Sequence, residues 1–166
     1  SYDPIFKVNP PLRTQRDVEA LREGLADGTI DIVATDHAPH PAEAKECEWQ
    51  EAAFGMLGLE SALAIVYQTM VATGLMNWEA VADRMSYAPA RIGRYQSHGQ
   101  KIAVGSVANL TLINPSQSSR VDRDLVASRS RNTPFHGMDL QGVITATFYR
   151  GLPTYLDGKL SPQGGS

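Results

Sequence analysis

The sequence has little cysteine, no long apolar run and no large excess of one charge. Its single cysteine, Cys47, excludes a disulfide within the chain and suits a reducing cytoplasm. It contains no stretch of about 18 apolar residues, so we expect no membrane-spanning helix. The net charge of -3 comes without clusters of Lys and Arg, which argues against a nucleic-acid partner.

The 166 residues, 42% of them hydrophobic, are enough for one domain or for a small domain plus part of another. The first dozen residues are irregular and start at Ser1, so we interpret the chain as a piece of a longer protein. The pattern becomes β-rich near residue 97. We therefore predict an α/β part over 1–97, a small β domain over 98–160 and a disordered tail over 161–166.

In the first part, local signals predict a helix followed by a buried strand. Thr14 and Asp17 resemble a capping box, and apolar residues recur at helical spacing over 15–27. The β-branched run 30–35 is apolar at nearly every position, which is typical of a strand covered on both faces. A helix followed by a buried strand is half of a β/α repeat.

The later elements are also predicted from apolar spacing and turn residues. We expect helices over 57–73, 77–85 and 89–93, with Leu59 and Trp78 on buried faces. We expect strands over 105–115 and 143–150, and a hairpin turn at Asp157-Gly158.

The segment DIVATDHAPH places an acid and two histidines directly after the predicted strand. The carboxyl ends of parallel strands carry the catalytic groups of β/α barrels. Asp36 in this position is suited to ligate a metal ion and to move a proton from metal-bound water to a leaving group. The alternative is a turn residue, with His37 bonded only to backbone, and Asp36 and His37 alone favour it. His40, four residues after Asp36, is not expected in a simple turn and favours a functional site.

Two more segments carry groups suited to binding a substrate. Pro10 and Pro11 hold the chain extended, so Asn9 presents an amide that both donates and accepts hydrogen bonds. Gly55 and Gly58 allow a close backbone approach, where free N–H groups bind an oxygen. Purely structural explanations, a rigid helix entry and a glycine-containing helix start, stay open and are favoured by spacing alone.

Three segments, in this order and spacing, resemble the C-terminal part of bacterial type I dihydroorotases of the amidohydrolase superfamily. They are KVNPPLR (7–13), IVATDHAPH (32–40) and FGMLGLE (54–60). The segments ANLTLINP (108–115) and SRSRNTPF (128–135) extend the resemblance over nearly the whole chain. It implies the last strand and helices of a (β/α)8 TIM barrel, followed by a small β-rich domain of the β-sandwich type.

The resemblance also implies an activity and roles for five residues. Dihydroorotases reversibly hydrolyse the cyclic amide of dihydroorotate to N-carbamoyl-aspartate in pyrimidine biosynthesis, using one or two zinc ions. Asp36 would be a zinc ligand and general acid/base, and His40 would bind the substrate carboxylate. Asn9 would hydrogen-bond the substrate, and the backbone of Phe54 and Gly55 would touch the ring edge.

Alternatives remain open at this point. Other cyclic amidohydrolases, such as hydantoinases and allantoinases, resemble dihydroorotases around the same aspartate. His40, which is placed to meet an acid group, favours dihydroorotate. A non-catalytic protein that uses this segment for assembly or binding is a further alternative.

The family's other zinc ligands are not found in the sequence, which contains no HxH pair. A catalytic zinc usually takes three protein ligands, so we expect this segment alone to be inactive and to hold zinc poorly. The expected partners are the small-molecule substrate and the rest of the parent protein. A homodimer and an association with aspartate transcarbamoylase, which some relatives form, are left open.

Overall fold

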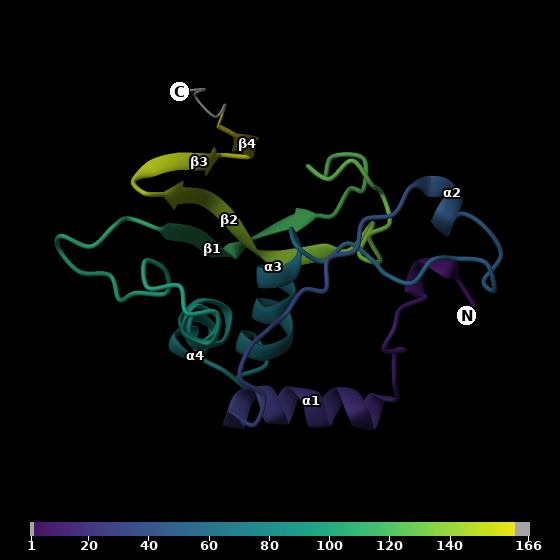
Figure 1. Cartoon of the computed structure of the whole chain (residues 1–166), viewed down its shortest axis with the longest axis horizontal. Helices are drawn as coiled ribbons and strands as arrows, with labels where there is room; N and C mark the ends of the chain where they lie inside the picture. Colours follow the sequence, from purple (N-terminus) through teal and green to yellow (C-terminus); the bar gives the residue numbers. More distant parts are fainter. Residues whose placement is uncertain (1, 162–166) are drawn as a thin grey trace.

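The computed structural model describes residues 2–161, which form a helical part and an antiparallel sheet (Figure 1). Except for Ser161, the predicted tail lies outside the described residues. The helical elements are η1 (Pro4–Phe6), α1 (Gln15–Asp27), α2 (Ala42–Lys45), α3 (Ala62–Val66), η2 (Tyr67–Val71), α4 (Trp78–Ala82), η3 (Asp83–Tyr87) and α5 (Ala88–Ile92). The strands are β1 (Leu110–Arg120), β2 (Asp139–Tyr149), β3 (Leu152–Leu156) and β4 (Lys159–Leu160).

Helix α1 has the bounds and the cap that the sequence predicts. The Thr14 side chain accepts from the Asp17 amide, and the Asp17 carboxylate accepts from the Thr14 amide at 3.0 Å, which completes the capping box. The helix ends at Gly28, whose φ of 92° is the left-handed conformation that glycine adopts easily. These interactions are local, so the sequence pattern is sufficient to predict them.

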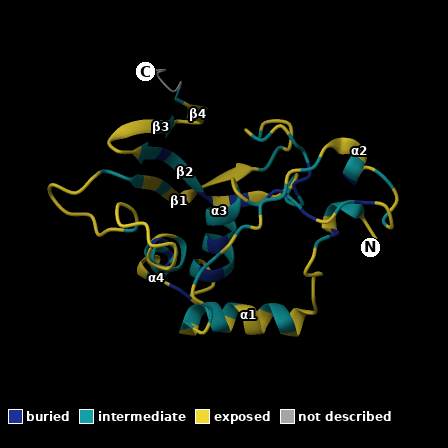
Figure 2. Ribbon diagram, viewed as in Figure 1, coloured by how far each residue is buried: buried dark blue, intermediate teal, exposed yellow. Residues whose placement is uncertain are grey.

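The helical core is built by α3, α4 and the π-helical turns η2 and η3 that continue them. Its four buried side chains are Val66, Met70, Met76 and Val81. Figure 2 shows dark, buried segments along the helix labelled α3. The Asn77 side chain accepts from the Ala80 amide and begins α4 as predicted. The expected burial of Leu59 and Trp78 is wrong, because these side chains are 62% and 38% exposed.

The sheet has the order β1-β2-β3-β4, and every pair is antiparallel. The hairpin predicted at Asp157-Gly158 joins β3 and β4. Helix α3 and turn η2 pack against β2, and Gly142 in β2 has only 3.1 Å between an added Cβ and the Tyr67 ring. Residues 2–161 form one layer of sheet, so the second layer that a β-sandwich needs is not found among them.

The predicted strand over residues 30–35 is not paired as a strand in this structure. Residues 31–36 have no regular secondary structure, and the Val33 amide donates to the Arg84 carbonyl at 3.1 Å. Strand assignment requires a hydrogen-bonded neighbour, and residues 2–161 supply one only at His37, which bridges Met56 in parallel. The apolar pattern predicted burial, while pairing depends on other segments.

The helix expected from residue 57 begins at Ala62 instead. The amides of Leu57, Gly58 and Leu59 donate to Asn132 and His37, which lie far away in the sequence. These contacts hold residues 57–59 outside the helix. The shift therefore has a tertiary cause that helical periodicity does not reveal.

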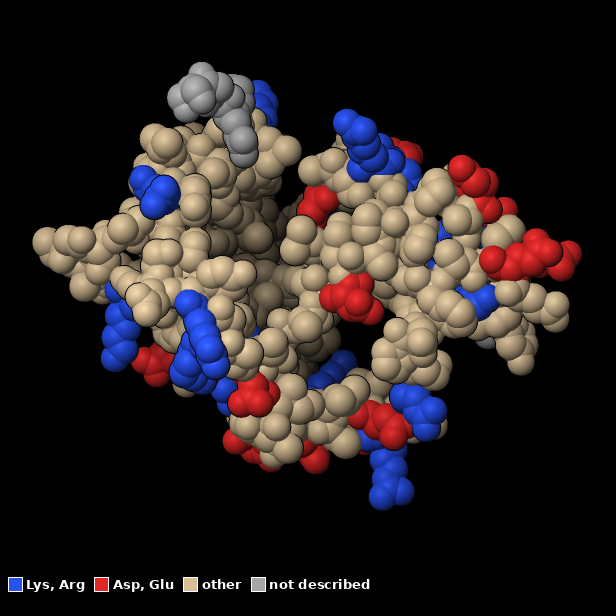
Figure 3. Space-filling model, in the orientation of Figure 1, with Lys and Arg blue, Asp and Glu red and all other residues tan. Residues whose placement is uncertain are grey.

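The surface is mixed in charge and is hollowed beside the sheet. Figure 3 shows Lys and Arg interspersed with Asp and Glu around α1. A groove of about 770 Å³ runs along β2, β3 and β4 and is lined largely by apolar side chains.

None of the helices within residues 2–161 has the length and apolar character needed to cross a membrane.

Candidate functional site

Asp36 lies at the end of the extended segment 31–36, directly before the first contact of the chain with the glycine-containing loop 54–60. Its side chain is exposed, and its backbone has a φ of 45°, a conformation that Asp and Asn tolerate better than most residues. The next residue, His37, bridges Met56, and the Ala38 amide donates to the Met56 carbonyl at 3.0 Å. The backbone directly after Asp36 is therefore held in place, while the carboxylate stays accessible.

His37 has a structural role in this arrangement. Its Nδ1 accepts hydrogen bonds from the amides of Gly58 and Leu59 at 3.3 and 3.2 Å. Because Nδ1 accepts, the ring proton of neutral His37 lies on Nε2. An added Cβ at Gly58 would lie 2.8 Å from the Thr35 carbonyl oxygen, so a side chain there would push the two segments apart.

The structure brings His40, Phe54 and Gly55 together. Nε2 of His40 lies 2.9 Å from the Phe54 carbonyl and donates to it, since a carbonyl only accepts. This bond leaves Nδ1 as the ring nitrogen available to a ligand. Gly55 has a φ of 132°, and an added Cβ would lie 2.5 Å from the Ala38 side chain and 3.0 Å from Nε2 of His40.

The Asn9 side chain is not joined to this group. It is exposed and forms no hydrogen bond with another residue of the described range 2–161. The nearby Lys7 carbonyl does reach the site, where it accepts from the Gly55 amide at 3.0 Å. Asn9 thus lies two residues after Lys7, which bonds Gly55. The predicted role of the Asn9 side chain in substrate binding stays a prediction.

Two buried lysines beside the site were not expected from the sequence. Lys45 is 4% exposed, and its ammonium donates to the carbonyls of Lys7 and Ala53 at 3.3 and 3.0 Å. Burial, together with the nearby Lys7 charge, lowers the pKa of Lys45 below its ordinary value of 10.5. Lys7 lies over the Phe54 ring, 4.7 Å from its centre.

We predict that the buried ammonium makes stability depend on pH. The folded state holds the Lys45 proton less tightly than the unfolded state, so stability rises as the pH increases through the window below 10.5. In the full-length protein, the Tm of wild type relative to Lys45→Met should increase as the pH is raised toward 10.5. Lys101→Met, at an exposed lysine, is the control, and a pH-independent difference for Lys45→Met would contradict the prediction.

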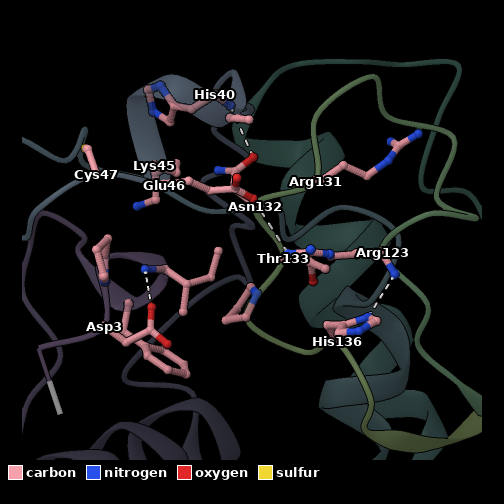
Figure 4. Close-up of a pocket in the computed structure, with 15 residues that line it drawn as sticks. Asp3, His40, Lys45, Glu46, Cys47, Arg123, Arg131, Asn132, Thr133 and His136 are labelled. Atoms are coloured by element: carbon pink, nitrogen blue, oxygen red, sulfur yellow. Dashed lines mark hydrogen bonds and ion pairs between the residues drawn. The ribbon is translucent and has the colours of Figure 1, made fainter.

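A cavity of about 480 Å³ lies next to His40. Figure 4 shows that side chains from the N-terminal segment, α2 and the loop before β2 surround it. Across it, Arg123 lies 3.8 Å from Glu46, which ties that loop to the end of α2. Of the five residues assigned from the sequence, only His40 lines this cavity, so it is not the expected site as a whole.

Asn132, like the two buried lysines, was not predicted from the sequence to belong to the site. It is 4% exposed, and its amide bonds the backbone of both Ala38 and His40. The segment SRSRNTPF, which contains it, contributes to the family resemblance, but no sequence signal assigned the amide a role. A contact across 92 residues has no local signature.

The described residues do not amount to a zinc site. No group of three His, Cys, Asp or Glu side chains suited to a metal occurs within residues 2–161. Both bonds to Nδ1 of His37 come from backbone amides, so this nitrogen is not free for a metal. Asp36 is an accessible carboxylate, and a zinc ion bound to it would need further ligands from outside residues 2–161.

Relatives of known name match nearly the whole chain. It is 60% identical over 161 residues to a dihydroorotase of Streptomyces coelicolor, covering 97% of this chain and 38% of that protein. It is 51% identical over 160 residues to a dihydroorotase of Mycobacterium tuberculosis, covering 96% of this chain and 37% of that protein. The chain thus spans little more than a third of the length of these relatives, and the resemblance to dihydroorotases is confirmed.

Two solved structures of similar fold are hydantoinases. The L-hydantoinase (dihydropyrimidinase) from Arthrobacter aurescens matches with a TM-score of 0.89 at 32% identity, over 97% of this chain and 36% of that one. A D-hydantoinase (dihydropyrimidinase) from Thermus sp. matches with a TM-score of 0.82 at 25% identity, over 96% and 36% of the two chains. The α/β class is confirmed as the hydantoinase type of TIM-barrel fold, here with an antiparallel sheet. Since residues 8–154 match the amidohydrolase family, the chain belongs to that family.

Proposed function

We propose that the full-length protein containing this chain is a dihydroorotase, which reversibly hydrolyses dihydroorotate to N-carbamoyl-aspartate. The observation that carries the proposal is the hydrogen bond from His40 to the Phe54 carbonyl beside Gly55. It joins the residue assigned to the substrate carboxylate with the backbone assigned to the ring edge. The identity of 60% to a named dihydroorotase supports the same conclusion.

Asp36 is proposed to carry the proton in ring opening. Water adds to the ring carbonyl carbon, the carbon–nitrogen bond breaks, and the ring nitrogen gains a proton. The Asp36 carboxylate accepts a proton from the attacking water and returns it to the ring nitrogen as the leaving group. Its exposed position at the end of residues 31–36 is compatible with both transfers.

His40 is proposed to bind the substrate carboxylate through Nδ1. The Phe54 carbonyl holds Nε2–H, so the ring orientation is fixed before a ligand arrives. A protonated ring then donates from Nδ1 to a carboxylate in a charge-assisted hydrogen bond. The Phe54 and Gly55 carbonyls already accept from His40 and Asn132, and each has a second lone pair with which it would meet the polar edge of the pyrimidine ring.

Other features of the whole protein are proposed on the resemblance. They are one or two zinc ions with most ligands outside residues 2–161, a barrel whose last part this chain forms, and a β-sandwich domain completed by other segments. The division at residue 97, the cytoplasmic location, a homodimer and an association with aspartate transcarbamoylase stay predictions. The segment alone is expected to be inactive.

A hydantoinase is the second candidate, because the structures of similar fold carry that name. The two candidates differ in the acid group on the ring. Purified full-length protein should open dihydroorotate, followed by ultraviolet absorbance, much faster than hydantoin or dihydrouracil. Faster opening of the rings without the acid would favour the hydantoinase, and no opening of any ring would contradict both.

Replacing His40 by alanine in the full-length protein is expected to raise KM for dihydroorotate by about tenfold or more, the usual effect of losing a charge-assisted hydrogen bond. For dihydrouracil, which has no acid group, KM should change little. Steady-state kinetics with both rings test this. His98→Ala, a histidine of the loop before β1, is the control. An equal rise for both rings would remove the carboxylate assignment.

A further inference from the structure

We infer that Asn132 is a positioning residue. It holds His40, the residue proposed to bind the carboxylate, at a fixed separation from residues 54–57, whose backbone is proposed to contact the ring edge. The inference rests on the proposed function, because it concerns the same substrate. It adds a residue from a segment distant in sequence, to which no role was assigned. Figure 4 shows the Asn132 side chain directed at the backbone of His40.

Asn132 forms hydrogen bonds with both segments of the site, and its partners in all of these bonds are backbone atoms. On the first segment, Oδ1 accepts from the His40 amide at 3.2 Å and Nδ2 donates to the Ala38 carbonyl at 2.9 Å. On the second, Nδ2 donates to the Gly55 carbonyl at 3.4 Å, and the Asn132 carbonyl accepts from the Leu57 amide at 3.0 Å. One residue therefore connects residues 38–40 to residues 55–57.

The amide group is chemically specific to this position. Asn132 is 4% exposed, so water does not replace a lost bond easily. The site needs an acceptor for the His40 amide and a donor for two carbonyls, which only a side-chain amide provides in this shape. An aspartate would keep the acceptor and turn its second oxygen toward the carbonyls of Ala38 and Gly55.

The consequence concerns the choice of substrate. The His40 ring is oriented by the Phe54 carbonyl, and its backbone is oriented by Asn132. With both fixed, Nδ1 of His40 lies at a set distance from the Gly55 turn. That distance selects a ring whose carboxylate and polar edge have matching separation, as in dihydroorotate.

The kinetic test uses full-length Asn132→Ala and Asn132→Asp. Both should raise KM for dihydroorotate by about tenfold, as loss of the carboxylate contact would, while kcat changes little. KM for dihydrouracil should stay near the wild-type value. Equal changes in KM for the two rings, or no change, would overturn the inference. Loss of the folded state in both variants would also overturn it, since Asn132 would then serve folding rather than positioning.

Asn109 provides a matched control. Its amide also bridges two backbone groups, donating to the Ser97 carbonyl at 3.2 Å and accepting from the Arg150 amide at 2.8 Å. It lies next to β1, away from His40. Asn109→Ala should leave both KM values unchanged. A KM rise equal to that of Asn132→Ala would show a general structural effect and overturn the inference.

A second readout is independent of activity. Lys45 is 4% exposed and ends helix α2, which lies in the segment that joins His40 to Phe54. If Asn132 holds the two ends of this segment, Asn132→Ala should accelerate trypsin cleavage after Lys45 at least several-fold, while Asn109→Ala should not. Unchanged cleavage would overturn the inference. If Asn132→Ala accelerates cleavage but the wild-type protein does not open dihydroorotate, the positioning role of Asn132 stands and the proposed function is wrong.

Discussion

Replacing Asp36 by asparagine in the full-length protein is expected to lower kcat about 10³-fold, the typical contribution of a general acid/base. Asparagine keeps the size of the side chain, but it removes the negative charge and the ability to take and return a proton. It also tolerates the backbone φ of 45° at this position, which alanine tolerates less well. The measurement is the rate of dihydroorotate opening, with circular dichroism to verify the fold.

Asp31→Asn is the matched control for this experiment. Asp31 is also exposed and lies in the same extended segment, five residues before Asp36. The substitution makes the same change in charge, so kcat should stay near the wild-type value. If Asp36→Asn retained activity within a few-fold of wild type, Asp36 would not carry the proton, and the proposed mechanism would be wrong.

Replacing Gly55 by alanine is expected to destabilise the full-length protein by about 3 kcal/mol or more, from backbone strain and overpacking together. Gly55 has a φ of 132°, which residues with a Cβ rarely adopt. The new methyl group would lie 2.5 Å from Ala38 and would displace the His40 ring. A large fall in Tm and a loss of dihydroorotate opening should therefore occur together.

Gly74→Ala separates the two causes. Gly74 also has a positive φ, of 78°, but an added Cβ would meet nothing within 4 Å. This substitution should cost only about 1 kcal/mol, the usual cost of the left-handed conformation. Equal falls in Tm for the two variants would mean that the contact of Gly55 with Ala38 and His40 is not important. Thermal unfolding followed by circular dichroism gives both values.

The sequence predicted those parts of the fold that depend on neighbouring residues. Helix α1 follows from the capping box of Thr14 and Asp17, and α4 begins at the predicted cap Asn77. The hairpin at Asp157-Gly158 follows from turn chemistry. In each case the interacting groups lie within a few residues of one another, so their spacing is visible in the sequence.

The parts that failed or were missed depend on distant contacts. Residues 31–36 have the composition of a strand, but no neighbouring strand pairs with them in the described residues. The start of α3 is shifted because His37 and Asn132 bind the amides of residues 57–59. The amide of Asn132 acts across 92 residues, and the buried Lys45 ammonium donates to the carbonyl of Lys7, 38 residues away. No spacing rule connects such positions.

The interactions of Asn132 with backbone atoms also matter for directed evolution. Its partners contribute carbonyl and amide groups, so the identity of the side chains at the neighbouring Phe54 and Met56 does not enter these bonds. The Phe54 side chain is 57% exposed and can be varied without filling a packed interior. A saturation library at Phe54 would therefore sample new ring substituents while the backbone bonds of Asn132 are kept.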